Sequence, residues 1–320
     1  MISGRTRRIV VLHLAIIGLL FVLQFVLPAY HHTNLARIMV LATFAMGYNI
    51  LFGYTGLMSL GHAMFFAAGM YGAGLCVYYL QFGAGAAFVL GILAGVSLAA
   101  VFGLFALRTT GVSFLIVTMM FGQACYLTLL YFNEITLGDQ GFTVSGNLQA
   151  LHQAGVGFAY SDPDVKFNAA WLVFAGALSI STAIAASPIG RVLIAVRVNE
   201  ERTRLLGYNT FAYKWLALCV SGAIAGAAGA AYALLFSYVG ASFASILYSI
   251  YPLLWTLLGG AGTTLGPLVG TGVMFYLIDL TSGWTAAYLF IVGGSLLALV
   301  LWFPQGLMGA VRARWARWLP

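Results

Sequence analysis

Long apolar runs, separated only by short polar or glycine-rich segments, constrain this chain more than any other feature. A bilayer span needs about 20 predominantly apolar residues, and runs of that kind recur throughout the sequence. The runs are apolar on every face, whereas strands of a membrane barrel alternate apolar and polar residues. The sequence therefore predicts an all-α polytopic membrane protein, with residues 1–320 forming a single transmembrane domain. We expect ten spans, at 9–28, 37–53, 57–80, 86–107, 112–133, 167–186, 211–237, 243–260, 264–281 and 285–303.

The composition excludes an ordinary soluble domain. The chain is 62% hydrophobic and 7% charged, while soluble domains are about 25% charged. The net charge of +7 does not indicate nucleic-acid binding, because the basic residues are spread along one side of the predicted membrane topology. We therefore expect a lipid bilayer, and no nucleic acid, as the surroundings of this chain.

The positive-inside rule fixes the expected orientation. With the N-terminus inside and the spans alternating, twelve of the fourteen lysines and arginines fall on the inner side, and only Arg37 and Lys166 fall outside. The basic N-terminus and the apolar run behind it are expected to form an uncleaved first span. Both termini are thus predicted to be cytoplasmic, in a multi-pass membrane protein.

Two glycine-rich breaks divide spans that would otherwise be continuous. They lie near 53–57 ("GYTGL") and 259–264 ("GGAGTT"). Irregular backbone at membrane depth is tolerated only where it is buried in protein or lines a water-filled cavity. Two connections are long: residues 134–166 are expected to form a periplasmic loop, and residues 187–210 a cytoplasmic loop.

The cytoplasmic loop 187–210 carries helix start and stop signals. Ser187 followed by Pro188 is typical of an N-cap and a first helical residue, and Asn199 is a second candidate N-cap. Gly207 is a plausible residue just beyond a helix C-terminus. The loop is therefore predicted to hold two short helices. Its charges suit either a solvated, positive-inside anchor or a docking element for a soluble partner.

Close helix packing is predicted where small residues recur. Gly222 and Gly226 have GxxxG spacing, and Gly229 lies beside them. Such spacing lets two membrane helices approach closely, so we assign these glycines a packing role and no role with substrate.

No motif indicates an enzyme, a metal site or a cofactor. There is no GxxxxGK[ST] phosphate loop, and no CxxC, HExxH or GxSxG motif. The spans also lack a central carboxylate, which a proton-coupled carrier commonly needs. A transporter of this kind takes its energy from another chain, or else is a passive channel.

Four ordered segments resemble a known family. They are 42–75 ("ATFAMGYNILFGYTGLMSLGHAMFFAAGMYGAGL"), 190–234, 257–270 ("LLGGAGTTLGPLVG") and 301–309 ("LWFPQGLMG"). Together they are similar to the branched-chain amino-acid type ABC importer permeases, the LivM-like membrane subunits. The likeness extends over nearly the whole chain and is specific for the family, but not for a substrate.

The resemblance implies a binding-protein-dependent importer. This chain would pair with a second, homologous permease subunit, with two cytoplasmic ATPase subunits that bind the ATP, and with a periplasmic substrate-binding protein. Its substrate would be a branched-chain amino acid or a related small polar solute such as urea or an amide. Two departures from the family pattern, Gln123 after the "FG" of span five and "TLGDQG" at 136–141, leave that substrate open.

The resemblance also implies that the cytoplasmic loop engages the ATPase. The candidate coupling residues are Arg197, Asn199, Glu200, Glu201, Arg202, Arg204, Leu205 and Leu206. The candidates for the substrate path lie beside the first break or are polar residues of span five: Tyr48, Asn49, Tyr54, Thr55, Ser59, His62, Thr118 and Gln123. The competing interpretation of the path candidates is hydrogen bonding and packing between helices.

Two other functions compete with the importer permease. A passive channel for a small neutral solute such as urea fits the nearly uncharged spans. A membrane scaffold or sensor would use the cytoplasmic loop only for docking, but it would have no need of glycine-rich breaks inside the membrane.

Overall fold

The computed structural model describes residues 4–153, 162–284 and 287–314, and it is mainly helical. The longer helices are α1 (Gly4–Leu23), α2 (Ala29–Asn49), α3 (Ala63–Tyr78), α4 (Ala84–Ala106), α5 (Val112–Tyr131), α8 (Pro163–Ala186), α9 (Pro188–Val198), α11 (Thr210–Phe236), α12 (Ile246–Gly259), α13 (Gly266–Ser282) and α14 (Tyr288–Trp302). The shorter elements are the π-helical turn η1 (Ile50–Tyr54), α6 (Asn133–Thr136), α7 (Ser145–Gln153), α10 (Glu200–Leu205), the 3-10 turn η2 (Ala241–Ala244) and α15 (Gly306–Arg314).

One small sheet joins two distant parts of the chain. Strand β1 (Phe142–Thr143) pairs antiparallel with β2 (Tyr238–Val239), with Phe142 opposite Val239. The sheet therefore fastens the connection after α5 to the C-terminal end of α11. The predicted external loop 134–166 contains α6, β1 and α7, and residues 154–161 of that loop lie outside the described residues.

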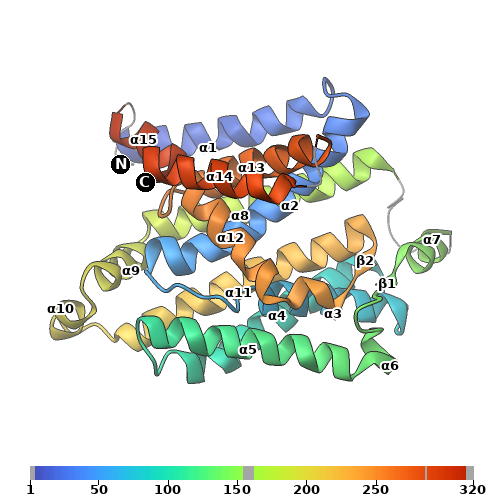
Figure 1. Ribbon diagram of the computed structural model, residues 1–320, viewed down its shortest axis with the longest axis horizontal. Helices are drawn as coiled ribbons and strands as arrows, with labels where there is room; N and C mark the ends of the chain where they lie inside the picture. Colours follow the sequence, from blue (N-terminus) through green and yellow to red (C-terminus); the bar gives the residue numbers. More distant parts are fainter. Residues whose placement is uncertain (1–3, 154–161, 285–286, 315–320) are drawn as a thin grey trace.

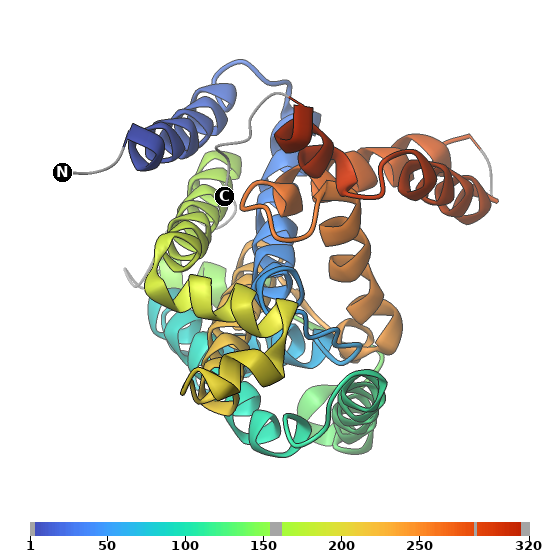
Figure 2. The same ribbon diagram turned by 90° about the vertical axis from the view of Figure 1, so that its left-hand side faces the viewer.

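Each predicted span overlaps one helix, namely α1 to α5, α8 and α11 to α14. Five of these are long and apolar enough to cross a membrane by length and composition: α2 continued by η1, α4, α5, α8 and α11. Helices α2 and α11 are mostly buried, whereas α4, α5 and α8 leave most of their apolar surface exposed. In Figure 1 and Figure 2, α5 lies at the edge of the bundle and α2 runs through its interior.

Glycines let α11 approach both α3 and α4 closely. A Cβ atom placed on Gly69 of α3 would lie 2.0 Å from the carbonyl oxygen of Gly226, and one on Gly229 would lie 1.9 Å from that of Phe66. Gly222 faces Gly95 and Ala99 of α4. The predicted packing role of the α11 glycines is thus confirmed, and it explains why these three helices form the tightest part of the core.

Replacing Gly69 with alanine is expected to destabilise the fold. The new methyl group would meet the backbone of Gly226, which cannot move aside as a flexible side chain can. Overpacking of this kind costs about 1–3 kcal/mol, so the thermal unfolding midpoint of the purified chain should fall. The matched control is Gly176→Ala in α8, where an added Cβ has no neighbour within 4 Å. Equal midpoints for the two variants would contradict the packing role.

The third predicted span begins later than expected. Residues 57–62 are apolar enough to extend the run, yet α3 starts only at Ala63. Gly56 has a φ of +78°, which ends the preceding helical turn. Gly61 then passes so close to α5 that a Cβ atom would lie 1.9 Å from the carbonyl oxygen of Thr118. The first break is therefore a segment of eight residues, 55–62, rather than a short kink.

The predicted second span begins earlier in the structure than at Arg37, its expected first residue. Helix α2 starts at Ala29, directly after Pro28, so Arg37 lies about two turns inside the helix. Its guanidinium carbon sits 5.0 Å from the ring centroid of Phe236 at the end of α11. This cation–π contact stabilises the charge at that position in α2. The polar residues that precede Arg37 in the sequence did not indicate this contact.

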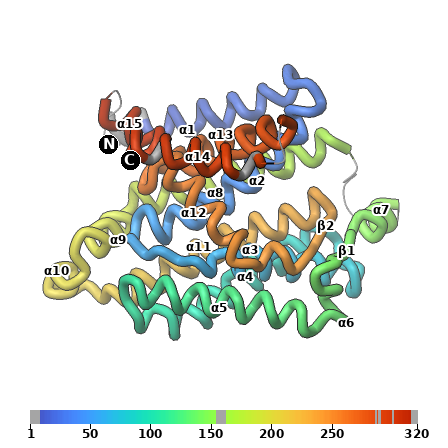
Figure 3. The backbone as a smooth tube through the Cα atoms, in the orientation of Figure 1, coloured from blue at the N-terminus to red at the C-terminus, as the bar shows by residue number. Residues whose placement is uncertain are grey.

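The elements with most of the positive charge lie at one end of the molecule. Helices α9, α10 and α15 and the start of α1 occupy this end, while α6, α7 and the small sheet occupy the opposite end (Figure 1, Figure 3). Three helices at the first end carry six arginines, which are Arg191, Arg197, Arg202, Arg204, Arg312 and Arg314. This separation is the one that the positive-inside rule predicts for the two sides of a membrane.

Candidate functional site

The loop between α8 and α11 folds into the two predicted helices. The Ser187 hydroxyl accepts a hydrogen bond from the Gly190 amide at 3.2 Å, which caps α9. Asn199 has an extended backbone that ends α9, and its side chain accepts from the Arg202 amide at 2.8 Å, which caps α10. Gly207, with a φ of +92°, follows the end of α10. Local capping therefore gives this loop a defined shape.

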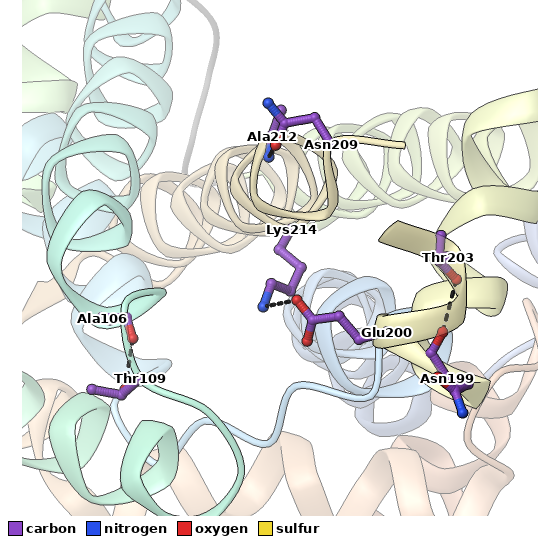
Figure 4. A network of polar contacts seen from close by, with 8 residues as sticks. All are labelled: Ala106, Thr109, Asn199, Glu200, Thr203, Asn209, Ala212 and Lys214. Carbon is purple, nitrogen blue, oxygen red and sulfur yellow. Dashed lines mark hydrogen bonds and ion pairs between the residues drawn. The ribbon is translucent and has the colours of Figure 1, made fainter. Parts of the chain in front are cut away.

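Two side chains fasten the loop to α11 and to the turn that continues α2, both of which are mostly buried. The Glu200 carboxylate of α10 lies 2.6 Å from the Lys214 ammonium of α11 (Figure 4), and the Lys214 side chain is almost wholly buried. Arg197 of α9 donates a hydrogen bond to the carbonyl oxygen of Gly53, in the π-helical turn that continues α2. Of the predicted coupling residues, Arg197 and Glu200 therefore form contacts within the chain.

The other predicted coupling residues lie on the outer surface of the loop. Leu205 and Leu206 are 85% and 76% exposed. Glu201, Arg202 and Arg204 are exposed around them, and Asn199 is exposed at the junction of the two helices. The outer surface of α10 thus combines two apolar side chains with charges of both signs. Such a surface is suited to docking a partner with an apolar groove and a charged rim.

The two glycine-rich breaks lie against each other. The side chain of Asn49 donates to the Thr263 carbonyl at 2.9 Å and accepts from the Gly262 amide at 2.8 Å. A Cβ atom on Gly53 would lie 2.5 Å from the Gly262 nitrogen, so only glycine allows this approach. The π-helical turn and the segment 260–265 are thus held together as one irregular region near α9.

The aromatic path candidates are packed inside the bundle. His62 is fully buried and stacks on Phe44, with ring centroids 5.3 Å apart, and its edge contacts Tyr48. Within the described part of the chain, neither ring nitrogen of His62 has a hydrogen-bond partner, and the hydroxyls of Tyr48 and Tyr54 also have none. These side chains are enclosed by protein in the present conformation.

The smaller polar candidates mainly bond to nearby backbone. Thr55 donates to the Ile50 carbonyl at 3.0 Å, and Thr118 donates to the Leu115 carbonyl in its own helix. Ser59 accepts from the Gly61 amide at 3.3 Å. Gln123 is half-buried on α5. The structure therefore brings the candidates of the first break together around α2, η1 and α3, with Thr118 facing Gly61 and Gln123 further along α5.

Two contacts of this region were not foreseen from the sequence. Lys214 was counted only as one of the inner positive charges, although it pairs with Glu200 fourteen residues away. His13 of α1, expected to have no special role, hydrogen-bonds through Nε2 to the Thr264 hydroxyl at 2.7 Å, and so fastens α1 to the second break. A lysine inside the first turns of an apolar helix is the one signal that pointed to a buried partner.

No metal centre is evident in the residues that the structure describes. Across 4–153, 162–284 and 287–314, no group of three or more His, Cys, Asp or Glu side chains is placed to hold a metal ion. The three cysteines are free and partly buried among apolar residues.

The fold and the site define a class of protein. Apolar helices with two adjoining glycine-rich breaks inside the bundle, and one capped, charged loop at one end, are features of a polytopic membrane permease. The family model described as branched-chain amino acid transport system / permease component matches residues 32–304. The chain belongs to this family.

Individual relatives agree with that assignment. The chain is 26% identical to the high-affinity branched-chain amino acid transport permease LivM of Salmonella typhimurium over 292 residues, which cover 86% of this chain and 69% of the relative. The LivM protein of Escherichia coli matches to the same extent. A probable LivM permease of Methanocaldococcus jannaschii is 32% identical over 93 residues, 29% of this chain and 26% of that protein.

A solved structure is also similar. It is an inward-facing ABC transporter described as being of metal-chelate type, with a TM-score of 0.49 and 16% sequence identity, covering 85% of this chain and 86% of that one.

Proposed function

We propose that this chain is a membrane-spanning subunit of a binding-protein-dependent ABC importer in the bacterial inner membrane, and that α9 and α10 receive the movement of an ATPase. The observation that carries the proposal is that this loop has both an exposed apolar surface and contacts with the interior of the bundle. It exposes Leu205 and Leu206 at the end of the molecule, while Arg197 and Glu200 fasten it to the interior. A solvated anchor would need neither feature.

The two contacts of the loop, Glu200 with Lys214 and Arg197 with Gly53, determine which helices a movement of the loop would displace. A partner bound to α10 acts through Glu200 on Lys214, and so on α11. The same displacement acts through Arg197 on Gly53, and so on the region where the two breaks meet. ATP binding and hydrolysis in the partner would thereby open or close the path beside the broken helices. ATP itself is bound by the partner subunits, and this chain holds no cofactor.

The proposed assembly follows from the family. A second, homologous permease subunit completes the path, two ATPases bind beneath the end that carries α10, and a binding protein docks at the opposite end, on the region 134–166. In this arrangement the termini and the loop 187–210 are cytoplasmic. The asymmetric distribution of arginines in the structure supports this orientation.

The proposed substrates are branched-chain amino acids or a related small polar solute such as urea or an amide. The relatives are described as branched-chain amino acid permeases. The described helices hold no carboxylate in their central turns, which suits a path for a net-neutral molecule. Gln123 in place of an acidic residue fits the same substrate class.

Reconstitution tests this function. Liposomes that contain the chain, its partner permease and the ATPases, with the binding protein added outside, should take up labelled leucine, isoleucine, valine or urea only when ATP is inside. Omitting the ATPases should abolish uptake. Uptake that persists without ATPases would instead establish a passive channel, and stable assembly without any uptake would establish a scaffold.

A further inference from the structure

A cavity of about 550 Å³ opens at the end of the molecule that carries α9 and α15. It lies beneath the region where the two breaks meet. The residues that line it come from the π-helical turn, α9, the end of α12, the second break, the segment after α14 and α15, and they include Phe52, Arg197, Leu257, Thr263, Gln305 and Arg312. None of the eight predicted path residues is among them.

Among the residues that the structure describes, the lining of this cavity carries positive charge and no acidic side chain. Arg197 and Arg312 face it from two different helices, and no Asp or Glu is among the lining residues. Glu200, the acidic residue nearest to Arg197 in sequence, is already paired with Lys214. Within the described part of the chain, Arg312 has neither an ion pair nor a hydrogen bond through its side chain, although it is half-buried. Two guanidinium groups that face one cavity, of which Arg312 is half-buried and Arg197 exposed, favour an anion between them.

The guanidinium geometry favours a phosphate group as that anion. Arg197 donates one of its N–H groups to Gly53, and a guanidinium carries five. Both arginines therefore retain N–H groups in the planar, paired arrangement that matches two oxygens of a phosphate. A small inorganic anion would not fill a cavity of this volume, whereas a phosphate with an organic substituent would.

The cavity lies next to exposed apolar side chains at the end of α14. Pro304 and Gln305 line the cavity, and one residue separates them from Leu301 and Trp302, which are 71% and 78% exposed at the end of α14. Exposed tryptophan is typical of the membrane–water interface. An acyl chain can therefore lie along the apolar surface of α14, where Leu297 is also exposed, while its phosphate reaches the arginines.

We propose that this cavity binds a phosphate group, supplied by an anionic phospholipid of the leaflet that surrounds α9 and α15. The bound phosphate bridges Arg197 and Arg312, and so connects the coupling loop with α15 and the second break. The site is independent of the proposed transport function, because it needs only the membrane and this chain. A soluble phosphate compound offers the same chemistry, and the experiment separates the two sources.

The test titrates the purified full chain in detergent with short-chain phosphatidylglycerol, phosphatidylcholine or inorganic phosphate, and follows the thermal unfolding midpoint. Phosphatidylglycerol should raise the midpoint in a saturable way, and phosphatidylcholine should do so only weakly. Arg312→Gln should weaken the apparent affinity for phosphatidylglycerol about tenfold, the loss expected for one charge-assisted contact. The matched control is Arg314→Gln, which removes the same charge from the same helix outside the cavity lining and should change the affinity less than about twofold.

Each outcome decides the proposal. Arg312→Lys keeps the charge but loses the paired N–H groups, so its affinity should lie between those of the wild type and Arg312→Gln, which distinguishes a lost contact from a misfolded chain. If millimolar inorganic phosphate displaces phosphatidylglycerol from the wild type, the phosphate site is supported and its source is a soluble compound. Equal weakening by Arg312→Gln and Arg314→Gln would overturn the site, because charge alone would then attract the lipid. Equal binding of phosphatidylcholine and phosphatidylglycerol would also overturn it.

Discussion

Replacing Leu205 and Leu206 together with serine is expected to abolish ATP-driven uptake while leaving the chain folded and inserted. Both side chains are exposed on α10 and make no contribution to the core, so the free energy of unfolding should be nearly unchanged. Burial of two leucines in a partner's groove is worth about 3 kcal/mol or more, which corresponds to a loss of about 100-fold or more in affinity for the ATPase. Co-purification of the ATPase and uptake in liposomes measure the two effects.

The matched control for this variant is Leu80→Ser. Leu80 follows the end of α3 and is 59% exposed. The control therefore makes the same leucine-to-serine change at an exposed site outside the loop 187–210. Uptake by this control should remain near the wild-type level. Normal ATPase binding by the α10 variant would remove the basis for the docking role of the two leucines.

Replacing Glu200 with glutamine is expected to separate ATPase binding from transport. The change leaves the Lys214 ammonium, which is 3% exposed, without its carboxylate partner. Removing one partner of a buried ion pair costs about 3–5 kcal/mol, and α10 should lose its firm connection to α11. We expect the ATPase still to bind through Leu205 and Leu206 and to hydrolyse ATP, while uptake per ATP falls by about tenfold.

Glu201→Gln provides the control, since it removes a charge from the neighbouring, exposed position. A double-mutant cycle with Lys214→Met isolates the pair itself. The combined variant should lose less than the sum of the two single variants, by about 1 kcal/mol or more. Additive losses, or an equal effect of Glu201→Gln, would show that the ion pair does not transmit movement.

The helices and caps of this protein were largely predictable because their signals are local. A span needs only a continuous apolar run, and the two helices of the loop 187–210 need only their caps at Ser187 and Asn199. The packing role of Gly226 was likewise predictable, because GxxxG spacing presents its small residues on one face of a helix.

The side-chain contacts that could not be predicted join residues that are far apart in the sequence. The direction of Arg197 is decided by a carbonyl group 144 residues away, and Asn49 joins two breaks that are more than 200 residues apart. The late start of α3 has the same origin. Leu57 and Met58 continue an apolar run, but Gly56 ends the preceding turn and Gly61 approaches α5 closely, and the helix resumes only at Ala63.

The positions of the Arg197–Gly53 and Glu200–Lys214 contacts determine how coupling responds to a change in bilayer thickness. Arg197 and Glu200 connect the loop to the turn that continues α2 and to α11, both of which are mostly buried inside the bundle. Helices α4 and α5, which expose most of their surface, take part in neither contact. A change in bilayer thickness is accommodated mainly by tilting of helices that face the lipid. The coupling contacts should therefore keep their geometry when the lipid composition of the cell changes with temperature or growth phase.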